Sequence, residues 1–314
     1  MVKKINLLFM GTNNFAQEVL STLLTMPEIN LVGVVCQPDK KIGRKQTIIF
    51  SPVKSLAIAQ KIRLFQPTKI IQAYENLQQL SIDVIVTCAY GQFLPEKILA
   101  LAKILPLNIH ASLLPKLRGG APIQWAIINN FSETGITLMQ MIQKMDAGAI
   151  FSQAKVKIST DETYSSLQRK LIVLAKKIIK SDLVPIISGK IKSNQQNESG
   201  VTFGFNITRH DELINWQQVA ALVSCQVRGL YDQPIAYSTI AGFIYKIHQV
   251  VISDQSSKKP PGTITLINKA GIFVATTDYD VIIKQIQPEG KKVMTASNYF
   301  GSKTNPIKVD LIFK

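Results

Sequence analysis

The first part of the chain alternates short apolar runs with amphipathic stretches, and this alternation constrains the fold more than any other feature of the sequence. Apolar runs occur at residues 5–10, 31–35, 84–88 and 107–109, with helical periodicity between them at 15–24, 53–60 and 95–101. Parallel strands joined by helical crossovers produce this pattern, because helices cover both faces of the sheet. We therefore predict a doubly wound, Rossmann-like α/β domain with a mostly parallel sheet.

The first domain is predicted to close with a long helix. Two further strand candidates, at 134–141 and 151–158, precede an amphipathic stretch at 164–187 whose apolar residues recur at helical spacing. Residues 190–208 then become rich in Ser, Asn, Gln and Gly and lose this periodicity, which is typical of a linker on the surface. Residues 1–189 are therefore expected to form the first domain.

Residues 209–314 follow a different pattern. After an amphipathic segment at 213–223, short β-rich runs separated by turn residues occur at 235–239, 243–251, 262–267, 271–276 and 281–286. Five such strands predict a small, OB-like β-barrel, and small open barrels often bind oligonucleotides. An SH3-like barrel or a plain sandwich would produce the same pattern.

The chain of 314 residues is strongly basic, with 36 Lys+Arg against 20 Asp+Glu and a formal net charge of +16. The excess is +11 in residues 1–179 and +4 in residues 206–314, so it is not confined to a tail. A polyanion such as a nucleic acid is the partner that this charge indicates, although a solvated lysine-rich surface would give the same count.

The cysteines and the apolar runs exclude several classes of protein. Cys36, Cys88 and Cys225 are too far apart in the sequence for a disulfide framework or a CxxC metal site. No run approaches the roughly 20 apolar residues of a membrane span. We therefore expect a cytoplasmic protein with no metal and no membrane association.

The segment from Gly11 to Ala16 follows a predicted strand and opens a helix, which is the position of a dinucleotide-binding loop. It lacks the second and third glycines of GxGxxG, and Gln37 stands where an acidic residue would end the second strand. A tight turn is the favoured interpretation, so a nicotinamide-dependent enzyme is not expected.

The most informative stretch begins with Asn108 and His110 at the end of a predicted strand. Their spacing of two places both side chains on one face of that strand, in the crevice where doubly wound sheets hold ligands. Asp146 follows 36 residues after the histidine, in a turn containing glycine. An Asn, a His and an Asp suit acyl transfer, because the amide and the imidazole can donate to an oxyanion while the carboxylate orients the imidazole. No Ser or Cys nucleophile motif adjoins the histidine, so direct transfer to an amine is favoured over a covalent intermediate.

These residues resemble a known family. The run NIHASLLPKLRGGAPIQWA, with its distant aspartate, is similar to the formyltransferases that use 10-formyltetrahydrofolate. The similarity extends along nearly the whole chain through FMGTNNFA, QPDKKIGRKQ, AYGQFLP, ETGITLMQM, PPGTI and PEGKKVM. Within the family, the chain is most similar to members that formylate methionyl initiator tRNA. The resemblance therefore implies 10-formyltetrahydrofolate as donor, initiator methionyl-tRNA as acceptor, and no DNA partner; we expect a monomer.

The resemblance also assigns residues to roles. It places catalysis on Asn108, His110 and Asp146. The folate site falls on Ser112, Leu113, Leu114 and Pro115, with Tyr90, Gly91 and the 137–141 strand as a further wall. The loop that contacts the tRNA acceptor end in the family falls on residues 39–50, which include Lys40, Lys41, Arg44 and Lys45. The family's second domain is a small barrel.

Two departures from the family pattern carry expectations of their own. Ala149 stands where the family commonly has a second Asp in the turn after Lys144-Met145, which affects the local hydrogen bonding and not Asp146. Asn13-Asn14 replace Pro-Asp, a change expected to affect only helix capping.

Two rival functions are considered. A formyltransferase for a small amine, such as glycinamide ribonucleotide or an amino sugar, would not need this length or this charge. A non-catalytic tRNA-binding protein with the same fold is opposed by the intact Asn108, His110 and Asp146.

Overall fold

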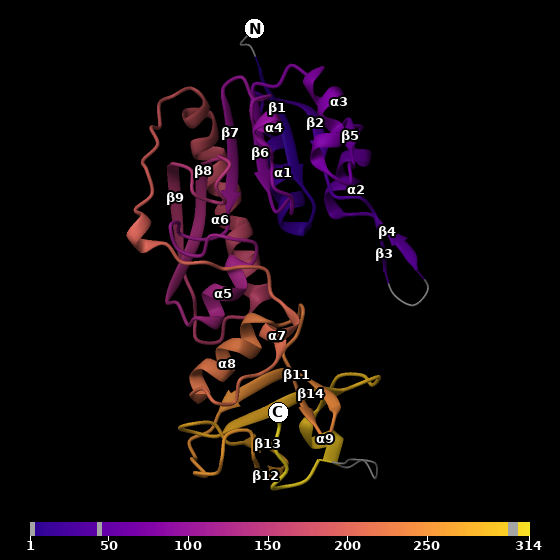
Figure 1. Ribbon diagram of the computed structural model, residues 1–314, viewed down its shortest axis with the longest axis vertical. Coiled ribbons are helices and arrows are strands. Elements are labelled where there is room, and N and C mark those ends of the chain that lie inside the picture. Colours follow the sequence, from indigo (N-terminus) through magenta and orange to yellow (C-terminus); the bar gives the residue numbers. More distant parts are fainter. Residues whose placement is uncertain (1–3, 43–45, 301–306) are drawn as a thin grey trace. The chain divides into compact units, whose positions relative to one another are not determined.

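The computed structural model describes residues 4–42, 46–300 and 307–314, and its elements are labelled in Figure 1. The chain divides into two compact units. Unit 1 contains residues 1–122, 133–156 and 168–205, and unit 2 contains residues 123–132, 157–167 and 206–314.

A seven-stranded sheet forms the centre of unit 1 within the described residues (Figure 1). Its order is β5 (Leu64–Phe65), β2 (Ile29–Val35), β1 (Ile5–Gly11), β6 (Val84–Cys88), β7 (Leu105–His110), β8 (Glu133–Gln140) and β9 (Ile150–Lys157). The pairings from β5 through β7 are parallel, whereas β7 and β8 are antiparallel. The prediction of a doubly wound, mostly parallel sheet is confirmed.

The helices follow the predicted crossovers. They are α1 (Asn14–Leu24), α2 (Pro52–Ala59), α3 (Tyr74–Gln78), α4 (Glu96–Leu99) and α6 (Tyr164–Ile187), with 3-10 turns η1 (Ile70–Ala73) and η2 (Glu198–Gly200). The Asn13 side chain accepts a hydrogen bond from the backbone N–H of Ala16 at 3.1 Å, so Asn13 caps α1 as expected. None of the helices in the described ranges combines the length and apolar composition that a membrane crossing requires.

The turn after β1 is closely packed. A Cβ atom on Gly11 would lie 2.6 Å from the Ala16 Cβ and 2.7 Å from the Cys88 carbonyl oxygen. Glycine is needed here because helix α1 and strand β6 approach the backbone. Gly11 therefore occupies a tight turn between β1 and α1.

Residues 190–205, which the sequence suggests as part of a linker, lie within unit 1. Ile150 and Asn194 exchange backbone hydrogen bonds of 2.8 Å in both directions. The Arg118 backbone N–H donates to the Thr202 carbonyl at 2.9 Å, and the Gly204 N–H donates back to the Arg118 carbonyl at 2.8 Å. This segment is therefore bonded to the loop that follows β7.

Unit 2 contains a curled, half-barrel antiparallel sheet. In the described part of the unit its strands follow the order β10 (Tyr237–Ile240), β11 (Phe243–Ile252), β14 (Val281–Pro288), β13 (Gly271–Val274) and β12 (Ile264–Asn268), with β15 (Met294–Thr295) beside β14. The register of β11 against β14 shifts near Gln249, an irregularity of the kind that bends strands. All five predicted strands are present.

Unit 2 also contains helices. In its described residues these are α5 (Pro122–Ile128, which begins at the last residue of the first segment of unit 1), α7 (Arg209–Glu212), α8 (Ala220–Gly229) and α9 (Ala296–Phe300). The amphipathic segment expected at 213–223 is not one element. Leu213 forms a bridge to Tyr237, and the helix starts only at Ala220. The backbone N–H of Ala220 donates to Asp278 at 2.8 Å, which supplies a cap from a distant turn that local periodicity does not reveal.

Candidate active site

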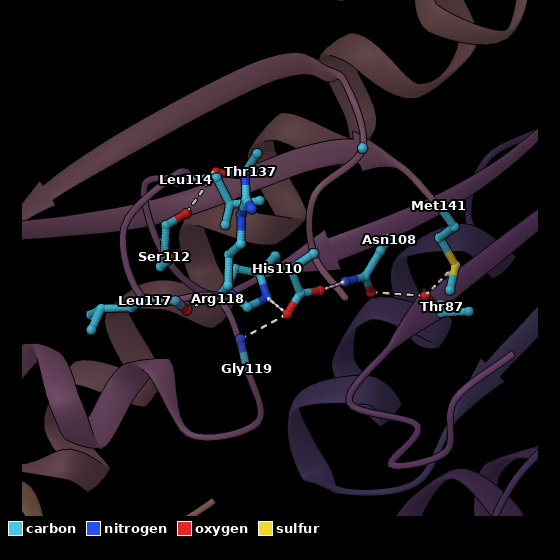
Figure 2. Close-up of polar contacts among 12 residues, drawn as sticks. Thr87, Asn108, His110, Ser112, Leu114, Leu117, Arg118, Gly119, Thr137 and Met141 are labelled. Atoms are coloured by element: carbon cyan, nitrogen blue, oxygen red, sulfur yellow. Dashed lines mark hydrogen bonds and ion pairs between the residues drawn. The ribbon is translucent and has the colours of Figure 1, made fainter. Parts of the chain in front are cut away.

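Asn108 lies near the end of β7 with both ends of its amide bonded (Figure 2). The Thr87 hydroxyl on neighbouring strand β6 donates to Asn108 Oδ1 at 2.8 Å. Asn108 Nδ2 donates to Asp146 Oδ1 at 3.3 Å. The Asp146 carboxylate can only accept, so it fixes Nδ2 as the end of the amide that faces it, and the Thr87 hydroxyl bonds the opposite end.

His110, the last residue of β7, is only 5% exposed. Its Nε2 lies 3.0 Å from the carbonyl oxygen of Leu117, which can only accept, so Nε2 is assigned the proton. Its Nδ1 lies 3.7 Å from Asp146 Oδ2, beyond hydrogen-bond distance but within that of an ion pair. Both ring nitrogens thus face acceptors, and Nδ1 is the less constrained of the two.

Asp146 lies in a left-handed backbone conformation, with φ of +47°. The backbone N–H of Gly119 donates to its Oδ2 at 2.8 Å. The turn also needs Gly148, because a Cβ there would lie 1.9 Å from the Gln140 carbonyl oxygen. The Ala149 carbonyl accepts from the Gln140 N–H at 2.9 Å, a backbone bond that does not depend on which side chain stands at 149.

Asn108, His110 and Asp146 are therefore brought together, as the sequence suggests. The Asp146 carboxylate accepts a hydrogen bond from the Asn108 amide through Oδ1. Its Oδ2 accepts from the Gly119 N–H and faces the His110 imidazole. The arrangement places amide and imidazole donors around a single anion, which is chemistry suited to stabilising a developing oxyanion.

The loop from Ser112 to Pro115 is held by two side chains of unit 1. The Thr137 hydroxyl donates to the Ser112 carbonyl at 2.6 Å and accepts from the Leu114 N–H at 3.2 Å. Gln153 Nε2 donates to the Leu114 carbonyl at 2.9 Å. Ser112 and Leu114 are buried, whereas Leu113 and Pro115 are half-buried. The predicted folate loop is thus rigidly anchored with part of its apolar surface accessible.

Tyr90 and Gly91 lie beyond the end of β6. The Tyr90 ring packs in the core of unit 1 with Leu8, Met10 and Val35, and burial raises the pKa of its phenol. No described residue makes a hydrogen bond with its hydroxyl. Gly91 is exposed with φ of +85°, a conformation that favours glycine. On this side of the predicted folate site, Gly91 is exposed, whereas the Tyr90 ring is buried.

The predicted acceptor-end loop contains a β-hairpin, β3 (Lys40–Ile42) and β4 (Thr47–Ile49). Lys40 is exposed, and the side chains of Ile48 and Ile49 are 56% and 52% exposed. The side chain of Lys41, together with Arg44 and Lys45, lies outside the described residues.

Sequence reasoning missed three residues that hold the site: Thr87, Arg118 and Gln196. Thr87 is inconspicuous within an apolar strand. Arg118 is part of the informative run, yet nothing local indicates that its side chain is only 1% exposed. Gln196 stands in a polar segment that looks unstructured, so its role depends wholly on tertiary contacts.

Comparison with known proteins agrees with this geometry. Residues 3–183 match the Formyl transferase family, and residues 206–304 match the Formyl transferase C-terminal domain. The chain belongs to the formyltransferase family. Membership confirms the resemblance, the α/β fold with its second β domain, and the prediction of a formyl-transferring enzyme.

Several relatives are similar to this formyltransferase over their whole length. A methionyl-tRNA formyltransferase of Mycoplasma mycoides is 44% identical over 313 residues, covering 99% of each chain. Another, from Staphylococcus aureus, is 42% identical over 304 residues, covering 96% of this chain and 97% of the relative.

Solved structures share the fold at lower identity. The sugar 3N-formyltransferase WlaRD, crystallised with dTDP and 5-N-formyl-THF, has a TM-score of 0.65 and 20% identity, covering 92% of this chain and 99% of its own. HypX from Aquifex aeolicus, in complex with tetrahydrofolic acid, has a TM-score of 0.64 and 18% identity, covering 98% of this chain and 50% of its own.

Proposed function

We propose that this formyltransferase moves the formyl group of 10-formyltetrahydrofolate to the α-amino group of methionine esterified to initiator tRNA. The observation that carries the proposal is the meeting of Asn108, His110 and Asp146 at the carboxyl edge of the sheet. The full-length similarity to methionyl-tRNA formyltransferases supports the choice of acceptor.

Asn108 and His110 act on the formyl oxygen. As the amine attacks, negative charge develops on that oxygen, and Asn108 Nδ2 and the imidazole donate to it. The amide has two N–H groups and Asp146 takes one, so the second can serve the oxyanion. His110 donates through Nδ1 in its protonated form, because its Nε2 proton is already bonded to the Leu117 carbonyl.

Asp146 completes the acid–base chemistry. Directly or through a water molecule, its carboxylate accepts the proton that the α-amino nitrogen must lose once it has attacked. That proton passes to the folate nitrogen as the bond between this nitrogen and the formyl carbon breaks, which releases tetrahydrofolate. The Gly119 N–H and the Asn108 amide hold the carboxylate in place during this step.

The folate donor would be held by the anchored loop Ser112–Pro115, facing the main chain at Tyr90 and Gly91. The half-buried side chains of Leu113 and Pro115 fit a flat, largely apolar heterocycle, and the exposed backbone at Gly91 offers polar groups for its edge. The donor supplies the formyl group, and these residues orient it. The chemistry assigned to this chain's own residues requires no metal.

The tRNA would be held by basic residues of both parts of the chain, including Lys40, Lys41, Arg44 and Lys45 of the acceptor-end loop. We further propose a catalytic domain at 1–189, a tRNA-binding barrel at 209–314 and a cytoplasmic monomer, with the connecting segment 190–208 bonded to the catalytic domain over residues 190–205. The net charges of +11 over 1–179 and +4 over 206–314 support an extended contact with a polyanion.

The test is incubation of the purified chain with 10-formyltetrahydrofolate and charged initiator tRNA, beside charged elongator methionine tRNA. Formylmethionine on the initiator tRNA is the expected product. A dTDP-linked amino sugar and glycinamide ribonucleotide serve as competing acceptors. Formylation of either small amine with charged tRNA left unmodified would refute the proposal. Binding of tRNA without any turnover would support the non-catalytic rival.

A further inference from the structure

Gln196 connects the two loops that flank the catalytic carboxylate. Its Nε2 donates to the carbonyl oxygens of Asp146 and Gly148, both at 2.8 Å. Its Oε1 accepts from Arg118 Nε at 3.1 Å and from Arg118 Nη2 at 2.8 Å. Both ends of one amide are therefore fully used, in a segment of the sequence that has no motif.

Arg118 anchors the other side of this connection. Its side chain is 1% exposed, and its guanidinium also pairs with Glu198 at 2.8 Å. A buried guanidinium without acceptors would be costly, so Gln196 and Glu198 together stabilise the position of Arg118. The backbone of Arg118 is bonded to Thr202 and Gly204 as well.

The residues on either side of Arg118 contact the catalytic groups directly. The Leu117 carbonyl lies 3.0 Å from His110 Nε2, and the Gly119 N–H donates to Asp146 Oδ2. A closed ring of contacts results, from the Asp146 carboxylate through Gly119 and Arg118 to Gln196 and back to the Asp146 carbonyl. Figure 2 shows Leu117, Arg118 and Gly119 around His110.

Asp146 needs such support because its backbone is strained. A non-glycine residue in the left-handed region persists only where neighbouring contacts impose it. The two hydrogen bonds from Gln196 hold the Asp146 and Gly148 carbonyls, on either side of Ala147. They therefore span the turn that sets the direction of the Asp146 carboxylate.

We propose that Gln196 is a positioning residue for formyl transfer, which acts on the reaction by holding the Asp146 carboxylate against Asn108 and His110. The inference rests on the proposed function, since it concerns the rate of that reaction. It assigns a chemical role to a segment that the sequence suggests is a linker.

The test uses Gln196→Glu in the full chain. The carboxylate keeps an acceptor for Arg118 but loses the amide donors and sets negative charge against two carbonyl oxygens. We expect kcat to fall about 10- to 100-fold, as misplacements near 1 Å do, while KM for folate and for charged tRNA changes by less than about threefold. Gln196→Asn, which keeps the amide but is shorter, tests the same point should Gln196→Glu fail to fold.

Gln226→Glu is the matched control. Gln226 Nε2 likewise donates to two carbonyls, those of Asp211 and Leu213, and Oε1 accepts from the Asn215 N–H at 3.1 Å. The two substitutions therefore remove the same kind of contact. We expect comparable losses of Tm but a loss of kcat only for the change at Gln196.

A double-mutant cycle with Asp146→Asn separates positioning from general damage. If Gln196 acts through the Asp146 carboxylate, adding Gln196→Glu to Asp146→Asn lowers kcat by less than about twofold. Wild-type kcat for Gln196→Glu or for Gln196→Asn, an equal fall of kcat in Gln226→Glu, or additive losses in the cycle would each overturn the inference. Absence of turnover in the wild type would instead refute the proposed function.

Discussion

Both units bury polar side chains, but they use them differently. In unit 2 the indole of Trp216 donates to the Ser238 hydroxyl at 2.9 Å, and that hydroxyl donates to the Lys314 carbonyl at 2.8 Å. In unit 1, Asn108, His110 and Asp146 face one another at the edge of the sheet. The first group satisfies donors and acceptors within a core. The second brings an imidazole and a carboxylate together beside an amide.

Burial of a polar residue therefore does not by itself indicate function. Hydroxyl groups that bond indole and backbone hold a structure together and change no charge during a reaction. An imidazole against a carboxylate can move protons. Substitutions in the two places should therefore affect different measurements.

The largest effect is expected for His110→Ala. Loss of an acid–base partner costs about 10²–10⁴-fold in rate. The partners of His110 in the described residues are Leu117 and Asp146, outside the predicted nucleic-acid loop, so kcat should fall by that range while tRNA affinity persists. His248→Ala in unit 2, which removes a histidine bonded to Gln287 at 3.0 Å, should leave kcat near wild type. Single-turnover kinetics and filter binding measure the two quantities. Near wild-type turnover by His110→Ala would refute the catalytic assignment.

A smaller effect is expected for Thr87→Val. The change keeps the side-chain shape but removes the hydroxyl that fixes the Asn108 amide, so we expect kcat to fall about 3- to 30-fold with little change in folate affinity. Ser238→Ala should lower Tm without changing kcat, because its bonds are structural. Equal kcat losses in the two variants would remove the distinction between the units.

A smaller effect again is expected for Arg44→Ala, on the salt dependence of tRNA binding. Each phosphate contact made by a Lys or Arg contributes roughly 0.7–0.9 to the slope of log affinity against log salt, so Arg44→Ala should reduce the slope by about that amount. Folate affinity should not change, because Arg44 is not among the predicted folate-binding residues. An unchanged slope together with an unchanged transfer rate would exclude Arg44 from tRNA recognition.

The smallest effect concerns Glu198. Hydrogen bonds from the Arg118 guanidinium, then from the Lys144 ammonium, hold the pKa of Glu198 at about 2, below its ordinary value of 4.5. A depressed carboxyl pKa stabilises the fold above the ordinary value and loses that contribution as pH falls toward the lower one. The Tm difference between wild type and Glu198→Gln should therefore be constant above pH 5 and shrink between pH 4.5 and about 2. It should be small and salt-sensitive, because Glu198 is largely exposed; a difference that grows in acid would contradict the assignment.

Apolar periodicity and residue spacing are enough to predict the fold class, most of the strands and the catalytic candidates. Strand β6 was predicted with its observed bounds and α6 likewise, because apolar periodicity reflects burial directly. Asn108 and His110 could be paired from their spacing alone, since alternate residues of a strand share a face. Asp146 is a candidate from its turn containing glycine, and the family resemblance joins it to Asn108 and His110 across two distant segments.

Tertiary structure alone decided how these groups are held. The site is held by the hydroxyl of Thr87, the buried guanidinium of Arg118 and the amide of Gln196, which stand 21, 10 and 88 residues from Asn108 in the sequence. Their contacts depend on strand order and loop packing, which leave no period in the sequence. Residues 190–205 have the composition of a linker for that reason. Backbone and amide groups of any polar segment can bond distant loops, so composition does not reveal these hydrogen bonds.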